Sequence, residues 1–183
     1  MEIIKAVPNQ KIIKNLLIIF LSSLLITISA KIKIPFYPVP MTMQTFVVML
    51  VGITFGWKIG VATISLYLFE GIIGLPVFAG TPEKGIGLTY FVGPTMGYLV
   101  GFIFATFIAG YLNYNTNILF IFLKLIFSVS IIYILGVSWL GNLIGWDKPV
   151  LELGLKPFLY AELFKILLLT ILTKKLITIR KFI

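Results

Sequence analysis

The sequence contains no cysteine and no histidine, and it is poor in charge. Without cysteine the chain forms no disulfide and offers no thiol nucleophile, and without histidine it lacks the commonest general base and metal ligand. Charged residues make up 11% of the 183 positions, too few to cover a water-soluble globule of this size. We therefore expect neither a metal site nor a soluble fold.

Hydrophobic residues make up 60% of the chain and the mean hydropathy is +1.10, against about 45–50% apolar residues in ordinary soluble domains. The net charge of +9 does not indicate nucleic-acid binding, because the basic residues lie mostly at the termini and beside apolar runs. That distribution is typical of proteins embedded in membrane lipid. A cleaved signal peptide is not expected, since the first apolar run is long and lacks a small-residue cleavage site.

Six apolar stretches are candidates for membrane-spanning helices, since a span needs about 20 apolar residues. In lipid a helix also forms all of its backbone hydrogen bonds internally. The sequence therefore predicts an all-α fold, an integral membrane bundle of six transmembrane helices that forms one substrate-binding domain over residues 1–183. The stretches are Ile12–Ala30, Met43–Phe55, Ile59–Leu75, Tyr90–Leu112, Ile118–Leu140 and Phe158–Thr173.

Lysine and arginine predict the orientation of this bundle. An even number of spans puts both termini on one side, and that side carries Lys5, Lys11, Lys14, Lys58, Lys174, Lys175, Arg180 and Lys181. The opposite side carries fewer basic residues, partly offset by Glu83, Asp147 and Glu152: Lys31, Lys33, Lys84, Lys148 and Lys156. The positive-inside rule then makes both termini cytoplasmic.

The first external loop reads IPFYPVP, with prolines at 35, 38 and 40. Proline fixes φ near −65° and donates no backbone hydrogen bond, so the loop is stiff and loses little entropy when it is ordered. It either forms a lid over an outward-facing cavity or simply connects two helices. The polar residues Thr42, Gln44 and Thr45 follow it directly.

Glu162 and Lys165 are three residues apart and share one face of the last helix. Lys165 lies too far along the helix to reach the headgroups easily, unlike Lys124, which is placed to do so. The two residues either neutralise each other or present an acceptor and a donor to a polar ligand. Glu70 lies near the outer end of its span and contacts either the headgroups or a ligand.

Glycine marks two further regions. The stretch LYLFEGIIGLPVFAG ends the third span with Gly71, Gly74 and Pro76, which continue a helix poorly. In GPTMGYLVG, the four-residue spacing of Gly97 and Gly101 predicts close helix packing.

These blocks together resemble one family. PVPMTMQTF, LYLFEGIIGLPVF, GPTMGYLVGF and GLKPFLYAELFK are similar, in order and spacing, to the BioY family, the biotin-specific substrate-binding (S) components of energy-coupling factor (ECF) transporters. The resemblance extends from about Ile12 to Leu172. It implies that biotin is the transported substrate, that no cofactor is needed and that the chain is a multi-pass protein of the bacterial cell (inner) membrane.

The resemblance also implies site residues. Pro38, Val39 and Pro40 correspond to the loop that closes over biotin. The chain departs from the family pattern at Met96, where glycine is usual, and at Glu162, where the family usually has aspartate. The implied ligand-binding residues are Thr42, Gln44, Tyr67, Tyr98, Glu162 and Lys165.

A membrane coupling protein and a pair of ATPases are the partners that the resemblance implies, and no phosphate-binding Gly-x-x-x-x-Gly-Lys loop occurs in this chain. Ser23, Thr27 and Ala30 offer a loose version of the small-residue docking surface on the first helix, or pack within the chain. The alternatives are an S component for another vitamin, a non-transporting membrane scaffold subunit and an intramembrane enzyme using Glu162 and Lys165.

Overall fold

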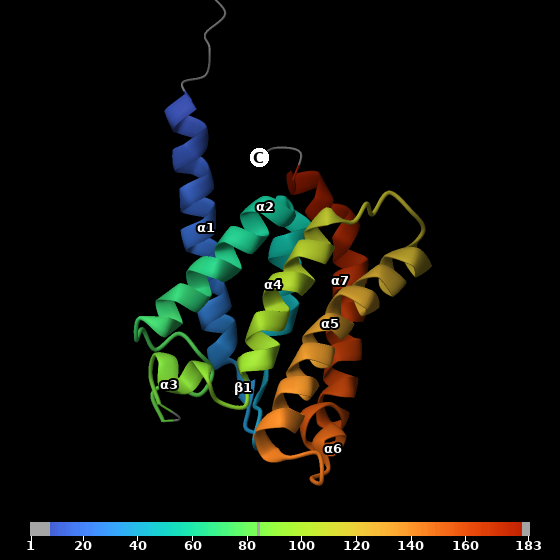
Figure 1. Ribbon diagram of the computed structural model, residues 1–183. Coiled ribbons are helices and arrows are strands. Elements are labelled where there is room, and N and C mark those ends of the chain that lie inside the picture. The colour runs from blue at the N-terminus through green and yellow to red at the C-terminus, as the bar shows by residue number, and fades with distance from the viewer. Residues whose placement is uncertain (1–7, 84, 181–183) are drawn as a thin grey trace, which may run out of the picture.

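The computed structural model describes residues 8–83 and 85–180, and forms a bundle of helices (Figure 1), as the sequence predicts. Lys5, Lys84 and Lys181 of the charge distribution above lie outside the described residues. The elements are α1 (Pro8–Lys31), β1 (Lys33–Ile34), β2 (Met41–Thr42), α2 (Gln44–Ile72), α3 (Leu88–Phe91), α4 (Met96–Tyr111), α5 (Ile118–Ile144), α6 (Val150–Gly154), the 3₁₀ helix η1 (Lys156–Phe158) and α7 (Leu159–Arg180).

Helix α2 consists of two arms, because Gly56 has φ 81° and ψ 169°, a conformation that side-chain-bearing residues rarely adopt. A Cβ atom built on Gly60 would lie 3.3 Å from the Cα of Gly52. In a straight helix these residues would be about 12 Å apart. The arms therefore fold back on each other, and Figure 1 shows them diverging from the turn. The predicted spans Met43–Phe55 and Ile59–Leu75 correspond to these arms.

Within the described residues, three helices are long and apolar enough to cross a membrane, over Gln10–Lys31, Gln44–Ile72 and Ile118–Ile144, and Met96–Tyr111 is a shorter apolar helix. The outer face of α1 exposes more than half of each of several large apolar side chains: Ile12, Leu16, Leu17, Phe20 and Leu21. Such a surface fits lipid rather than water as the solvent. The chain is therefore a helical membrane protein.

One predicted helix was wrong. The stretch Tyr90–Leu112 is not one helix: α3 ends at Phe91 and α4 begins at Met96, because the intervening Gly93-Pro94 interrupts the helical backbone. The final helix continues past Thr173 to Arg180. The chain also contains a two-residue antiparallel ribbon, which the all-α prediction omitted: Lys33 pairs with Thr42 and Ile34 with Met41.

Glycine lets α4 pack closely against both of its neighbours. A Cβ on Gly52 would lie 2.7 Å from the carbonyl oxygen of Thr106, and one on Gly101 would lie 2.7 Å from the Cα of Ile132. Since lipid provides no hydrophobic driving force between helices, such close backbone contact supplies much of the packing energy. The predicted role of Gly97 and Gly101 in close packing is confirmed, because both face α5.

We expect Gly52→Leu to lower the thermal unfolding midpoint in detergent by several degrees. The added side chain meets backbone of α4, which cannot yield as a flexible side chain would, and overpacking of this kind typically costs about 1–3 kcal/mol. The matched control is Ser65→Leu, which adds similar bulk on an exposed face of the same helix. An equal midpoint for the two variants would contradict the close-packing account.

Candidate ligand-binding site

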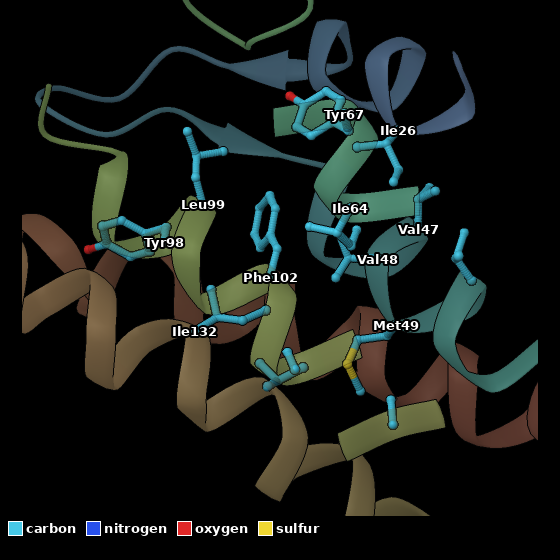
Figure 2. Packing of buried hydrophobic residues seen from close by; sticks show 14 of the residues in the cluster. Ile26, Val47, Val48, Met49, Ile64, Tyr67, Tyr98, Leu99, Phe102 and Ile132 are labelled. Atoms are coloured by element: carbon cyan, nitrogen blue, oxygen red, sulfur yellow. The ribbon is translucent and has the colours of Figure 1, made fainter. Parts of the chain in front are cut away.

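A cavity of about 50 Å³ lies where the β1–β2 hairpin meets α2, α4, α5 and α7. Its walls are mainly apolar and aromatic, and Figure 2 shows Tyr98, Leu99 and Phe102 along α4 with Ile132 of α5 beside them. Its polar lining comes from residues distant in sequence: Thr42, Gln44, Thr45, Thr95, Glu162 and Lys165. An enclosed apolar space with a few convergent polar groups is the usual form of a small-molecule site.

Glu162 and Lys165 form a buried ion pair at this cavity. Lys165 Nζ lies 2.6 Å from Glu162 Oε1, and the two residues are only 5–6% exposed. The predicted common face is confirmed, since both side chains line the cavity from α7.

The Lys165 ammonium makes three hydrogen bonds, which is the number of its donors. Besides Glu162, it donates to Thr45 Oγ1 at 2.9 Å and to the Thr42 carbonyl at 2.6 Å. Thr45 in turn donates to Glu162 Oε1 at 2.6 Å. The network is closed, so a ligand that binds Lys165 has to replace one of its present partners.

Gln44 and Tyr67 form the second polar unit. Gln44 Nε2 donates to the Tyr67 hydroxyl at 2.7 Å, and that hydroxyl donates to the Val77 carbonyl at 3.3 Å. Tyr67 is fully buried against Phe78, with ring centroids 5.5 Å apart, and it does not line the cavity. The structure thus places Gln44 in the wall and Tyr67 behind it, where Tyr67 holds the amide in position.

Tyr98 lines the cavity with its ring, while its hydroxyl donates to the Gly154 carbonyl at 2.7 Å. Tyr133 packs edge-on against Tyr98, with centroids 6.0 Å apart, and interacts electrostatically with Glu162. Tyr133 and Glu162 also line a larger apolar groove of about 680 Å³ between α5 and α7. The side chains of Tyr133 and Glu162 therefore separate the cavity from this groove.

The Pro-rich loop covers the cavity at the hairpin. Val39 and Pro40 are lining residues, whereas Pro38 is buried but does not line the cavity. Phe36 packs on Phe158, with centroids 6.2 Å apart, and so joins the hairpin to η1. The loop thus covers the cavity, and its action as a lid over a ligand stays a prediction.

Two lysines fasten the hairpin to the loop after α2. Lys31 Nζ donates to the Phe78 carbonyl at 2.9 Å and Lys33 Nζ donates to the Ala79 carbonyl at 2.8 Å. Lys33 also lies 3.5 Å from Glu83. These contacts explain why two lysines occur on the side of the bundle that the charge count predicts to be poor in them.

The small residues of α1 face inward. Ser23 is buried and its hydroxyl donates to the Glu70 carboxylate, whose two oxygens lie 3.0 and 3.1 Å from Ser23 Oγ, so Glu70 links α1 to α2. Ala30 is also buried, and Thr27, which is partly exposed, donates to the Ser23 carbonyl. In this conformation the stripe packs within the chain, and its use for docking stays a prediction.

Sequence reasoning missed several residues of the site, among them Thr45, Tyr133 and Phe158. Thr45 was visible as part of the polar cluster after the prolines, but nothing in the sequence linked it to Lys165. Tyr133 and Phe158 carried no signal, because an aromatic residue in an apolar run faces lipid or core according to tertiary packing alone. All three line the cavity.

Comparisons with known proteins agree on one family. The model of the BioY family matches residues 4–182. The chain is 34% identical to the probable biotin transporter BioY of Pyrococcus horikoshii, over 89% of this chain and 96% of that protein. It is 36% identical to the biotin transporter BioY of Thermotoga maritima, over 83% and 89% respectively. The fold is similar to the crystal structure of the S-component for biotin from an ECF-type ABC transporter, with a TM-score of 0.76 and 25% identity over 93% of this chain and 94% of that one.

We expect Lys165→Met to destabilise the protein by about 3–5 kcal/mol, because removing one partner leaves the buried Glu162 carboxylate uncompensated. Adding Glu162→Gln should restore much of the loss, since the burial cost of the charge disappears with it. Thermal midpoints of the single and double variants in detergent measure this coupling.

The matched control is Lys156→Met, which breaks the exposed ion pair between Glu152 and Lys156. Exposed pairs contribute about 0–1 kcal/mol. If the buried and exposed variants lost similar stability, or if the double variant were no better than the single one, the buried pair would not carry the energy assigned to it.

Proposed function

The chain belongs to the BioY family, and from this premise we propose that it takes up biotin as the substrate-binding subunit of an ECF-type transporter. The relatives are named as transporters, so the intramembrane enzyme has no support. The single observation that carries the site assignment is the closed hydrogen-bond network of Lys165, which faces the cavity between the hairpin and α7.

Biotin fits the chemistry of this network. Its ureido ring has two N–H donors and a carbonyl, its thioether side is apolar, and its tail ends in a carboxylate. We propose that Glu162 accepts from a ureido N–H and that Lys165 donates to the ureido carbonyl or the carboxylate. Gln44 offers both a donor and an acceptor at the same wall, and Thr42 offers its carbonyl and its hydroxyl. The ring of Tyr98 provides an apolar surface. Tyr67 acts indirectly, by orienting the Gln44 amide.

Binding requires the cavity to open. About 50 Å³ is well below the roughly 300–1,000 Å³ of ordinary ligand sites, so we infer that this conformation is a closed one. The hairpin, with Pro38, Val39 and Pro40, is the element that covers the cavity, and its contacts through Lys31, Lys33 and Lys165 must break or shift as biotin enters. No bond of biotin is made or broken, and we propose that no cofactor takes part.

We further propose six membrane spans: α1, the two arms of α2, α4, α5 and α7. Helix α1 begins and α7 ends at the end of the bundle where the α2 arms meet (Figure 1), and this end carries Lys11, Lys14, Lys58 and Arg180. The positive-inside rule supports a cytoplasmic assignment for both termini. The chain would then be a single multi-pass domain of the bacterial inner membrane.

Transport is proposed to need a membrane coupling protein and a pair of ATPases, because the similar crystal structure is named as part of an ECF-type ABC transporter. In such an assembly this chain captures biotin from outside and the partners supply the energy for release inside. An S component for another vitamin would bind that vitamin instead, and a scaffold subunit would show no saturable binding.

We expect the purified chain to bind biotin saturably, in preference to other vitamins added as competitors. Lys165→Ala should weaken this binding at least about 30-fold, because truncating one partner of a buried charge pair costs about 2–5 kcal/mol. Equilibrium binding of labelled biotin in detergent measures it, with Lys156→Ala as a control outside the cavity. Unchanged affinity in Lys165→Ala would exclude the proposed site, and absence of binding to folded protein would exclude biotin.

The lid makes a second prediction, which the lack of native cysteine makes easy to test. A cysteine at Val39, 5% exposed at the cavity wall, should react slowly with a maleimide without biotin, since transient opening exposes it. Saturating biotin should slow the reaction further, at least severalfold. A cysteine at Tyr37, which is 85% exposed, is the control and should react fast in both states. An identical rate at Val39 with and without biotin would rule out closure of the lid over the ligand.

A further inference from the structure

A second cavity, of about 380 Å³, lies at the end of the bundle opposite the hairpin. Its floor is the turn between the two arms of α2, from Phe55 to Ile59, and its walls are Lys11 and Asn15 of α1 and Arg180 of α7. It shares no residue with the cavity of Glu162 and Lys165. Nothing in the biotin site requires it.

The charge in this cavity is entirely positive. Lys11, Lys58 and Arg180 line it, and within the described part of the chain no carboxylate is among the lining residues. None of the three cations belongs to an ion pair of the described residues. Within residues 8–83 and 85–180 the acidic residues belong to other parts of the chain: Glu70 in the last turn of α2, Glu83 in the loop after α2, Asp147 between α5 and α6, Glu152 in α6 and Glu162 in α7.

The cavity is also shaped by specific contacts. Arg180 closes over the turn because residue 56 is glycine: a Cβ there would lie 2.7 Å from Nη2 of Arg180. The Lys58 ammonium lies 5.5 Å from the centroid of the Trp57 ring, which is 37% exposed. A partly exposed tryptophan beside lysine and arginine is typical of the boundary between hydrocarbon and headgroups.

We propose that this cavity binds the phosphate of an anionic membrane phospholipid. Guanidinium and ammonium groups form charge-assisted hydrogen bonds with phosphate oxygens, and basic pockets between helices at the membrane surface bind anionic headgroups. The apolar side chains that follow Lys11 and Asn15 along α1, Ile12 and Leu16, are 57% and 60% exposed. They provide an apolar surface for the acyl chains directly beside the cations. A lipid would use this surface, whereas an acidic protein segment would not, and we therefore choose lipid as the occupant.

The test is native mass spectrometry of the full chain, purified in detergent with equimolar phosphatidylglycerol and phosphatidylcholine. The wild-type chain should retain phosphatidylglycerol preferentially. The double variant Lys58→Gln/Arg180→Gln should lose that preference by about fivefold for each cation removed, since a basic side chain near the surface contributes roughly that factor.

The matched control is Lys174→Gln/Lys175→Gln. It removes the same charge from exposed positions near the same end of α7, outside the cavity. Retention of the preference in this control, with its loss in the cavity variant, supports the proposal. An equal loss of preference in both variants would mean that the basic surface attracts anionic lipid diffusely. No preference in the wild type would exclude lipid as the occupant. Either result overturns the proposal.

Discussion

The buried Lys165 ammonium is the interaction on which the rest of the site depends. A charge in this interior is tolerated because every one of its donors has an acceptor, and those acceptors come from three places in the chain: Glu162 on its own helix, Thr45 at the start of α2 and the Thr42 carbonyl in β2. Desolvation makes each bond necessary, since an unpaired buried charge is strongly unfavourable. The ammonium therefore fixes the hairpin, α2 and α7 relative to one another.

Glycine fixes the remaining elements. The α2 turn at Gly56, the contact of Gly52 with α4 and the contact of Gly101 with α5 allow backbones to approach to distances that no side chain permits. These contacts bring Tyr98 and Phe102 of α4 to the same cavity as α7. The hydrogen-bond network of Lys165 and the helices packed through glycine therefore border the same cavity.

Much of this arrangement was predictable because its causes are local. Gly71, Gly74 and Pro76 end a helix by backbone chemistry alone, and α2 ends at Ile72. The i, i+3 spacing placed Glu162 and Lys165 together for the same reason. The β1–β2 ribbon, the position of Tyr67 behind Gln44 and the bond from Lys165 to Thr42 were not predictable from the sequence. Each depends on residues far apart in the chain, whose meeting is decided by the packing of whole helices. The family resemblance supplied the ligand, which neither spacing nor composition could identify.

The ribbon that covers the cavity is short, since each strand has two residues. Few backbone hydrogen bonds therefore have to break for it to open, and its hold on the bundle rests on side chains such as Lys33 and Phe36. For a protein that exists mainly in the closed form, the measured dissociation constant is the intrinsic one divided by the open fraction. Because few backbone bonds oppose opening, the open fraction depends mainly on side-chain contacts, the bond from Lys165 to the Thr42 carbonyl among them. The stiff prolines between the two strands therefore determine the shape of the closed site, whereas the few bonds of the ribbon determine the free energy needed to open it for the ligand.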